Sequence, residues 1–199
     1  IVGAWVADRL LGSERTLFYS ACLIMLGHIS LAIIPGLPGV GVGLVLIAFG
    51  SGGLKANATS LVGDLYAPDD ERRDAGFSIF YMGINLGGLL GPLLTGWAQD
   101  NWGFHVGFAL AAVGMALGLI QYTLGRRHLQ GIGASAPNPL PAADRPRVMV
   151  LTIVAVVVVA VLSLTGVIST GNLSEVVVAL TVVAAVAYFA VILTSSRIT

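Results

Sequence analysis

Residues 40–62, with the sequence VGVGLVLIAFGSGGLKANATSLV, form an apolar run that carries a single charged side chain, Lys55. A helix needs about 20 predominantly apolar residues to cross a membrane, so this run is long enough. Five further windows of similar character follow the same rule: 16–34, 75–98, 104–124, 148–168 and 176–194. The apolar residues 1–7 resemble the end of one more span. The sequence therefore predicts an all-α integral membrane protein with six full spans and a helix stub.

The composition supports the same class. Of 199 residues, 56% are hydrophobic and 10% charged, with a mean hydropathy of +0.92. Because a soluble domain carries about 25% charged residues, a soluble protein and a nucleic-acid-binding protein are both excluded. Cys22 is the single cysteine and has no partner for an internal disulfide. No nucleophile–base set, metal motif or phosphate-binding loop is found, so we expect neither an enzyme nor a cofactor.

The basic residues predict the orientation in the membrane. When the predicted spans alternate in direction, the segments 8–15, 67–74 and 125–147 and Arg197 fall on one side. The linkers on the other side contain neither Lys nor Arg. The basic side is the cytoplasmic one. It holds nine of the ten basic residues: Arg9, Arg15, Arg72, Arg73, Arg126, Arg127, Arg145, Arg147 and Arg197.

A stretch rich in Pro, Gly and Ala divides the chain. Residues 129–147 contain Pro137, Pro139, Pro141 and Pro146 and predict a flexible cytoplasmic linker. Residues 1–128, before it, carry the polar and small residues of a helical bundle. The two predicted helices within residues 148–199, after it, are almost wholly Val, Ala, Leu and Ile, and they predict an accessory two-helix hairpin that faces lipid. Three regions are therefore expected: 1–128, 129–147 and 148–199.

Lys55 is the first candidate binding residue. It lies nine residues before Asp64 at the cytoplasmic end of its span, which places it about 14 Å into the membrane. A lysine at such depth costs about 2.5–3.5 kcal/mol on insertion scales. The alternative is that the side chain snorkels to the interface, but its stem reaches only about 6 Å. We favour a role in binding an anionic ligand or a carboxylate.

Asn85 is the second candidate. It lies eleven residues beyond Asp74, about 16 Å in from the same side, and thus near the depth of Lys55 on the next helix. Tyr81 shares its helix face. Gly83, Gly87 and Gly91 form a close-packing stripe on another face. Asn85 either lines a polar cavity or hydrogen-bonds a neighbouring helix, and we favour the cavity.

Two histidines fall in or near the spans. His28 lies about mid-membrane, where a proton relay is possible in principle, but a hydrogen bond to a neighbouring helix is the favoured interpretation. His105 lies near the outer boundary, where we expect an interfacial role. Trp97, Trp102 and Tyr122 lie near span ends, as in an aromatic belt.

Residues 3–15, GAWVADRLLGSER, resemble the cytoplasmic loop motif of the major facilitator superfamily. A glycine turn followed by Asp and Arg can cap and pair helix ends when the cytoplasmic gate is closed. The candidate gating residues are Gly3, Asp8, Arg9, Gly12 and Arg15.

A second resemblance is more specific. Residues 77–89, FSIFYMGINLGGL, resemble the signature of the proton-dependent oligopeptide transporter family. The segments LKAN at 54–57, LVGDLY at 61–66, GFHVGF at 103–108 and AAVGM at 111–115 resemble further family blocks in the family's order. The last two predicted helices are similar to the pair inserted between the two halves of bacterial members.

The resemblance implies a major facilitator fold and symport of di- and tripeptides with protons by alternating access in the plasma membrane. It implies that Lys55 and Asn85 contact the peptide and that Tyr81 assists. The chain would then be one part of the transporter, from the end of helix 2 to the inserted pair. Its expected partners are small peptides, protons, lipid and the remainder of the same transporter. The alternatives are another proton-coupled solute transporter of the superfamily and a structural membrane bundle without flux.

Overall fold

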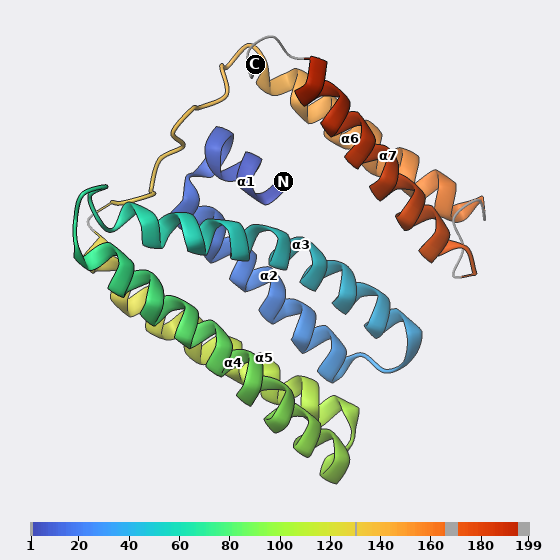
Figure 1. Cartoon of the computed structure of the whole chain (residues 1–199). Helices are drawn as coiled ribbons and strands as arrows, with labels where there is room; N and C mark the ends of the chain where they lie inside the picture. The colour runs from blue at the N-terminus through green and yellow to red at the C-terminus, as the bar shows by residue number, and fades with distance from the viewer. Residues whose placement is uncertain (1, 130, 166–170, 195–199) are drawn as a thin grey trace. The chain divides into compact units, whose positions relative to one another are not determined.

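The computed structural model describes residues 2–129, 131–165 and 171–194 (Figure 1). The chain divides into two compact units, Ile1–Leu140 and Pro141–Thr199. The elements of the first unit are α1 Val2–Val6, the π-helix η1 Ala7–Leu11, α2 Ser13–Ile33, α3 Gly36–Asp64, α4 Arg72–Trp102, α5 Phe104–Gly125 and the short 3-10 helix η2 Arg126–Leu129. The second unit contains α6 Arg145–Leu164 and α7 Leu173–Thr194.

Four helices of the described chain are long and apolar enough to span a membrane. They are Ser13–Ile33, Gly36–Asp64, Arg72–Trp102 and Phe104–Leu129, and they correspond to the predicted windows 16–34, 40–62, 75–98 and 104–124. The predicted windows 148–168 and 176–194 fall on α6 and α7. The end of the window 148–168 lies outside the described residues, as does Arg197. The all-α membrane class is confirmed for the described chain.

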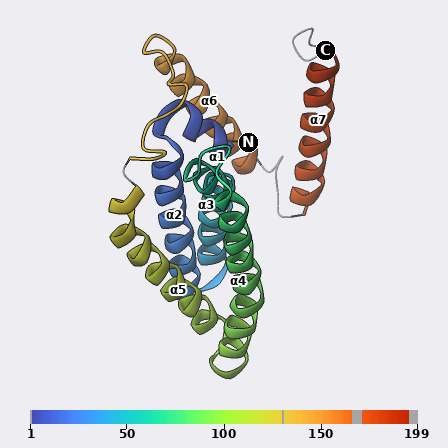
Figure 2. The ribbon, with the colours of Figure 1, turned by 60° about the vertical axis from the view of Figure 1, so that its left-hand side comes forward.

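Helix α2 is the centre of the first unit. It packs along α3 on one side and along α5 on the other, an arrangement that Figure 2 shows. Small residues permit the contact with α3, since a Cβ on Gly27 would lie 2.8 Å from the Gly43 carbonyl oxygen. A Cβ on Gly50 would likewise lie 2.6 Å from the Ser20 carbonyl oxygen. Close backbone approach of this kind replaces the hydrophobic driving force that helices lack in lipid.

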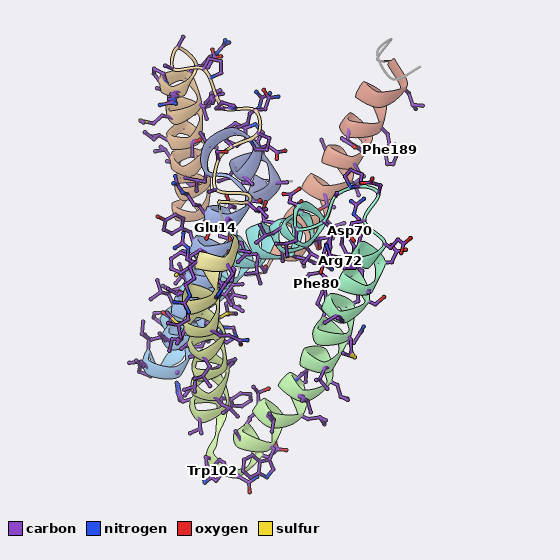
Figure 3. The ribbon with its side chains drawn as sticks, turned by 90° about the vertical axis from the view of Figure 1, so that its left-hand side faces the viewer. Glu14, Asp70, Arg72, Phe80, Trp102 and Phe189 are labelled. Carbon is purple, nitrogen blue, oxygen red and sulfur yellow. The ribbon has the colours of Figure 1, made fainter. Side chains whose placement is uncertain are left out.

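Helix α4 contacts α5 and meets α3 in only a few places. Figure 3 shows α4 and α5 joined near Trp102 and diverging away from it. Residues 81–90 of α4 are exposed on every face. A Cβ on Gly83, Gly87 or Gly91 would have nothing within 4 Å. Within the described chain, the predicted glycine packing stripe therefore has no partner helix.

The segment around Asp8 differs from its predicted loop. The predicted loop 8–15 is almost wholly helical, because η1 continues to Leu11 and α2 begins at Ser13. Only Gly12 interrupts the two helices, with a φ of 86° that favours glycine. Gly12 N–H donates to the Ala7 carbonyl oxygen at 2.9 Å, which closes the last wide turn of η1. The sequence predicted that the helix ends before the charged pair Asp8 and Arg9, whereas the helical segment continues to Leu11.

The predicted flexible linker also differs. Residues 131–140 belong to the first unit and are hydrogen-bonded to residues 8–14 through three backbone contacts. The α6 helix already begins at Arg145, inside the predicted linker 129–147. Pro and Gly content predicted a linker, but it did not reveal that residues 131–140 dock onto the first unit.

Candidate functional site

Lys55 lies on α3 with its side chain exposed. Its backbone carbonyl accepts a hydrogen bond from Thr59 Oγ1 at 3.2 Å. In the described part of the chain its ammonium group forms no hydrogen bond and no ion pair. The structure thus presents a cation on the surface of a membrane-length helix, and that charge needs water, an anion or a partner from elsewhere to be stable in a membrane.

Asn85 lies on α4, where its Nδ2 donates to the Tyr81 carbonyl oxygen at 2.8 Å. One amide N–H is thereby used on its own helix. The second N–H and the carbonyl oxygen of an asparagine remain able to bond a ligand. Within the described residues, Asn85 forms no hydrogen bond to another helix, which was the alternative interpretation.

Tyr81 presents an exposed ring beside Asn85. Its ring stacks with Phe77 at a centroid separation of 6.4 Å and an interplanar angle of 27°. Phe80 lies at 5.7 Å, tilted by 57°. The aromatic neighbours orient the Tyr81 ring, and the hydroxyl is left to contact a ligand.

In the described part of the chain, the structure joins Asn85 to Tyr81 but does not bond Lys55 to either of them. No hydrogen bond or ion pair joins Lys55 to Asn85 or Tyr81 among the described residues. All three side chains are exposed. They lie on α3 and α4, which contact each other in only a few places. An arrangement of this kind leaves the Lys55 ammonium group, the Tyr81 hydroxyl and the remaining amide groups of Asn85 able to bond a ligand.

Asn57 is a buried polar residue that the sequence patterns did not single out. It is 2% exposed. Its Nδ2 donates to the Gly53 carbonyl oxygen at 2.7 Å and to the Gly3 carbonyl oxygen at 3.2 Å. The second bond ties α1 to α3. Asn57 lies two residues from Lys55, on a different face of the helix. The sequence feature that could have identified it is an amide side chain inside an apolar run.

The candidate gating residues occupy the joint between α1 and α2. Gly3 packs directly on Gly52 and Gly53 of α3, where any Cβ would collide with backbone. Arg9 Nη1 lies 3.5 Å from the Asn138 carbonyl oxygen. The side chains of Asp8 and Arg15 are exposed, and neither forms an ion pair within the described chain. The capping and pairing expected of the motif therefore stays a prediction.

A buried ion pair beside this joint went unrecognised in the sequence. Glu14, at the start of α2, is 4% exposed. Arg126 Nη2 donates to Glu14 Oε2 at 3.1 Å, and Arg126 Nε lies 2.9 Å from Glu14 Oε1 in an ion pair. Tyr122 adds a hydroxyl donor at 3.3 Å, and the Phe18 ring lies 5.3 Å from Arg126 Cζ. Tyr122 thus donates a hydrogen bond to the buried Glu14 carboxylate, a role that the expected aromatic belt did not include.

The two histidines bond backbone carbonyls. His28 Nδ1 lies 2.9 Å from the Ile24 carbonyl oxygen, four residues back on the same helix. Among the described residues His28 forms no hydrogen bond to a neighbouring helix, so that expectation stays a prediction. His105 Nδ1, at the start of α5, donates to the Leu31 carbonyl oxygen at 3.0 Å and so covers the carboxyl end of α2.

One exposed ion pair lies in the connection between α3 and α4. Arg72 Nε and Nη2 donate to Asp70 Oδ1 and Oδ2 at 3.1 and 2.8 Å. The Arg72 backbone N–H also donates to Asp70 Oδ1. These hydrogen bonds favour the carboxylate and lower the pKa of Asp70 to about 2. The carboxylate fixes the turn that starts α4.

Comparison with known proteins extends these observations. The POT family model matches residues 14–187. An uncharacterized transporter, YclF of Bacillus subtilis, is 43% identical over 99% of this chain and 40% of its own length. A di-/tripeptide transporter of Lactococcus lactis subsp. cremoris is 50% identical over 77% of this chain and 31% of its own length. The chain thus spans well under half the length of these relatives.

Solved structures agree with the fold. A peptide transporter POT in complex with sulfate has a TM-score of 0.92 and 44% identity, over 98% of this chain and 41% of its own. A POT family transporter in complex with 5-aminolevulinic acid has a TM-score of 0.90 and 39% identity, over 100% of this chain and 42% of its own. The relatives are transporters, as expected of a chain that is not an enzyme. This chain is a membrane protein with part of a major facilitator superfamily bundle, and it belongs to the POT family.

Proposed function

We propose that this chain is part of a symporter that moves di- and tripeptides with protons across the plasma membrane by alternating access. The remainder of the transporter would complete the bundle and the pathway. The segments 8–15, 67–74 and 125–147 would face the cytoplasm. The relative from Lactococcus lactis named as a di-/tripeptide transporter supports peptides as the substrate class.

The observation that carries the proposal is the exposed ammonium group of Lys55 on a membrane-length helix. Its insertion cost of about 2.5–3.5 kcal/mol is offset when a negative group approaches it. A peptide carries one fixed anion, its C-terminal carboxylate, together with amides that need hydrogen-bond partners. Lys55 would bind the carboxylate through a charge-assisted hydrogen bond.

Asn85 and Tyr81 would hold the peptide backbone. The carbonyl oxygen and the second amide N–H of Asn85 match the donor and acceptor of a peptide bond. The bond from Asn85 Nδ2 to the Tyr81 carbonyl oxygen fixes the amide plane before a ligand arrives. The Tyr81 hydroxyl adds one further donor. Because backbone groups are common to all peptides, contacts of this type give affinity without selecting a side-chain sequence.

Proton coupling follows from competition for Lys55. Carboxylates in the remainder of the transporter would pair with Lys55 when no peptide is bound, and a proton on such a carboxylate would release the ammonium group for the peptide. The protons are the coupling ion, and no other cofactor is needed. Movement of α3 and α4, whose mutual contacts are few, would expose the site to one side at a time.

The test uses the full-length protein that contains this chain, reconstituted in liposomes. Uptake of a labelled dialanine-type peptide is measured with and without an inward proton gradient. Accumulation that needs the gradient and is blocked by excess unlabelled peptide supports the proposal. Uptake of another solute in place of peptides favours a different proton-coupled transporter of the superfamily. A folded preparation with no flux of any solute favours a structural bundle.

A further inference from the structure

Residues 131–140, here called the strap, run over the joint at Gly12. The Asn138 N–H donates to the Asp8 carbonyl oxygen at 3.0 Å, and the Leu140 N–H donates to the Arg9 carbonyl oxygen at 2.8 Å. The Gly133 carbonyl oxygen accepts from the Glu14 N–H at 3.0 Å. All three are backbone bonds between segments more than a hundred residues apart.

These bonds satisfy backbone groups at helix ends that have no side-chain cap. The last carbonyls of a helix and its first N–H groups lack partners within the helix. Asp8 and Arg9 lie in η1, which ends at Leu11, and Glu14 is the second residue of α2. Neither end carries a side-chain cap, since no side-chain cap bond is formed at Gly12. The strap therefore caps η1 and α2 together.

The fit at Gly12 is tight. A Cβ on Gly12 would lie 2.9 Å from both the Ala134 carbonyl carbon and the Ser135 nitrogen. A Cβ on Gly133 would collide with the Ser13 hydroxyl oxygen and approach Leu61 Cδ1 to 3.0 Å. Gly133 has a φ of 68°, which favours glycine. The two glycines let the strap lie directly on the joint.

We propose that the strap is a positioning segment, which holds Asp8 and Arg9 in one rigid body with α2 throughout the transport cycle. Chain flexibility between the two units would then begin after Leu140 rather than at residue 129. The capping part of this inference stands by itself. The part that concerns the transport cycle rests on the proposed function.

Amide hydrogen exchange on the full-length protein tests the capping. The useful fragment runs from Ser135 to Pro141. Its first two amides lose their label, and its three prolines have no N–H. The label that it retains therefore reports Asn138 and Leu140 alone. These two amides should exchange at least about tenfold more slowly than the Ala136 amide. The exchange of Ala136 is measured in a fragment that starts further upstream. Equal exchange at all three overturns the capping.

A disulfide tests the rigid body. Ser13→Cys and Gly133→Cys are combined in a full-length protein whose other cysteines are replaced, with each single variant as a control. Oxidation should cross-link the pair, and the oxidised protein should transport peptide within about twofold of its reduced form. A pair that does not cross-link overturns the docking, provided that the Gly133→Cys single variant keeps the slow exchange of the Asn138 and Leu140 amides. Transport that is lost on oxidation and recovered on reduction overturns the rigid body.

Removal of one capping bond tests the positioning role. Asn138→Pro removes the donor to Asp8, and Ala136→Pro is the matched control that removes no described bond. Asn138→Pro should lower the turnover rate several-fold and leave the half-saturating peptide concentration unchanged, because no hydrogen bond or ion pair of the described residues joins the strap to Lys55 or Asn85. An unchanged turnover overturns the positioning role. If the unmodified protein transports no peptide, the proposed function fails while exchange and cross-linking still report on the strap.

Discussion

Glu14 and Arg126, 112 residues apart in the chain, form an ion pair in which the Glu14 side chain is 5% exposed and the Arg126 side chain is 40% exposed. The pair joins the first turn of α2 to the residue that follows α5. Glu14 also lies where a negative charge is favoured by the helix dipole. The pair joins two helices that pack along one another and are also linked by the bond from His105 to the Leu31 carbonyl oxygen.

Arg126→Ala should destabilise the protein more than Glu14→Gln does. Loss of Arg126 leaves a buried carboxylate without its cation, which costs about 2–4 kcal/mol after allowance for the partial exposure of the arginine. Glu14→Gln keeps a neutral acceptor for Arg126 and should cost about 1 kcal/mol. Thermal unfolding of the full-length protein in detergent measures both. Arg127→Ala is the control, and an equal loss with that variant would refute a specific pair.

Lys55→Ala should abolish proton-driven peptide uptake while the protein still reaches the membrane, because the cation that would bind the peptide carboxylate is lost. Uptake into liposomes with an inward proton gradient measures the effect. Ser60→Ala, an exposed substitution on the same helix, should transport normally. Full gradient-driven uptake by Lys55→Ala would rule out the assigned role of this residue.

Asn85→Ala should raise the half-saturating peptide concentration by about tenfold, which corresponds to the loss of about 1.4 kcal/mol of hydrogen bonding. The chain provides a matched control in Asn101. Its Nδ2 donates to the Trp97 carbonyl oxygen at 2.8 Å, the same bond on the same helix. Asn101→Ala should leave the peptide affinity unchanged. Equal affinities for wild type and Asn85→Ala would make Asn85 a packing residue.

Asn57→Ala should lower the stability by about 1–3 kcal/mol, since two carbonyl oxygens lose a donor at a buried position. The substitution also releases Gly3 from α3. The expected signature is a lower melting temperature together with easier proteolysis near residues 2–11. Asn101→Ala removes a similar bond at an exposed position and should be nearly neutral; a similar melting temperature for both variants would contradict the buried role.

The Asp70 carboxyl should titrate with a pKa of about 2 in the folded protein. Because the folded pKa lies below the unfolded value, the ion pair contributes stability at neutral pH. That contribution fades as the pH falls from about 4 towards 2. Carbon-13 NMR of labelled aspartate measures the midpoint. Arg72→Gln should raise the pKa of Asp70 towards the free value of about 3.9, but not fully, because the backbone N–H of residue 72 still donates; Arg73→Gln should not move it. A midpoint near 4 in the unmodified protein would show that the pair does not form.

The candidate site was only partly visible in the sequence. Lys55 and Asn85 stand out because a charge or an amide is costly in an apolar run, and that cost is read from a single segment. Asn57 carries the same signal, but its role needed the position of Gly3, more than fifty residues away. In the sequence, Glu14 is one of several charged residues near the predicted cytoplasmic side, and nothing distinguishes it from the others. Its burial depends on Arg126, which no spacing rule connects to it.

The sequence by itself determined the helical membrane class and the approximate limits of the long helices, because hydropathy and length act within one segment. It placed the helix end at Asp8 wrongly, since the capping groups that let η1 run to Leu11 come from the strap. Only the tertiary structure decided that residues 131–140 dock on the joint at Gly12 and that Glu14 finds Arg126. Both depend on backbone and side-chain groups that are distant in the chain, and such groups meet only when α2 and α5 are packed.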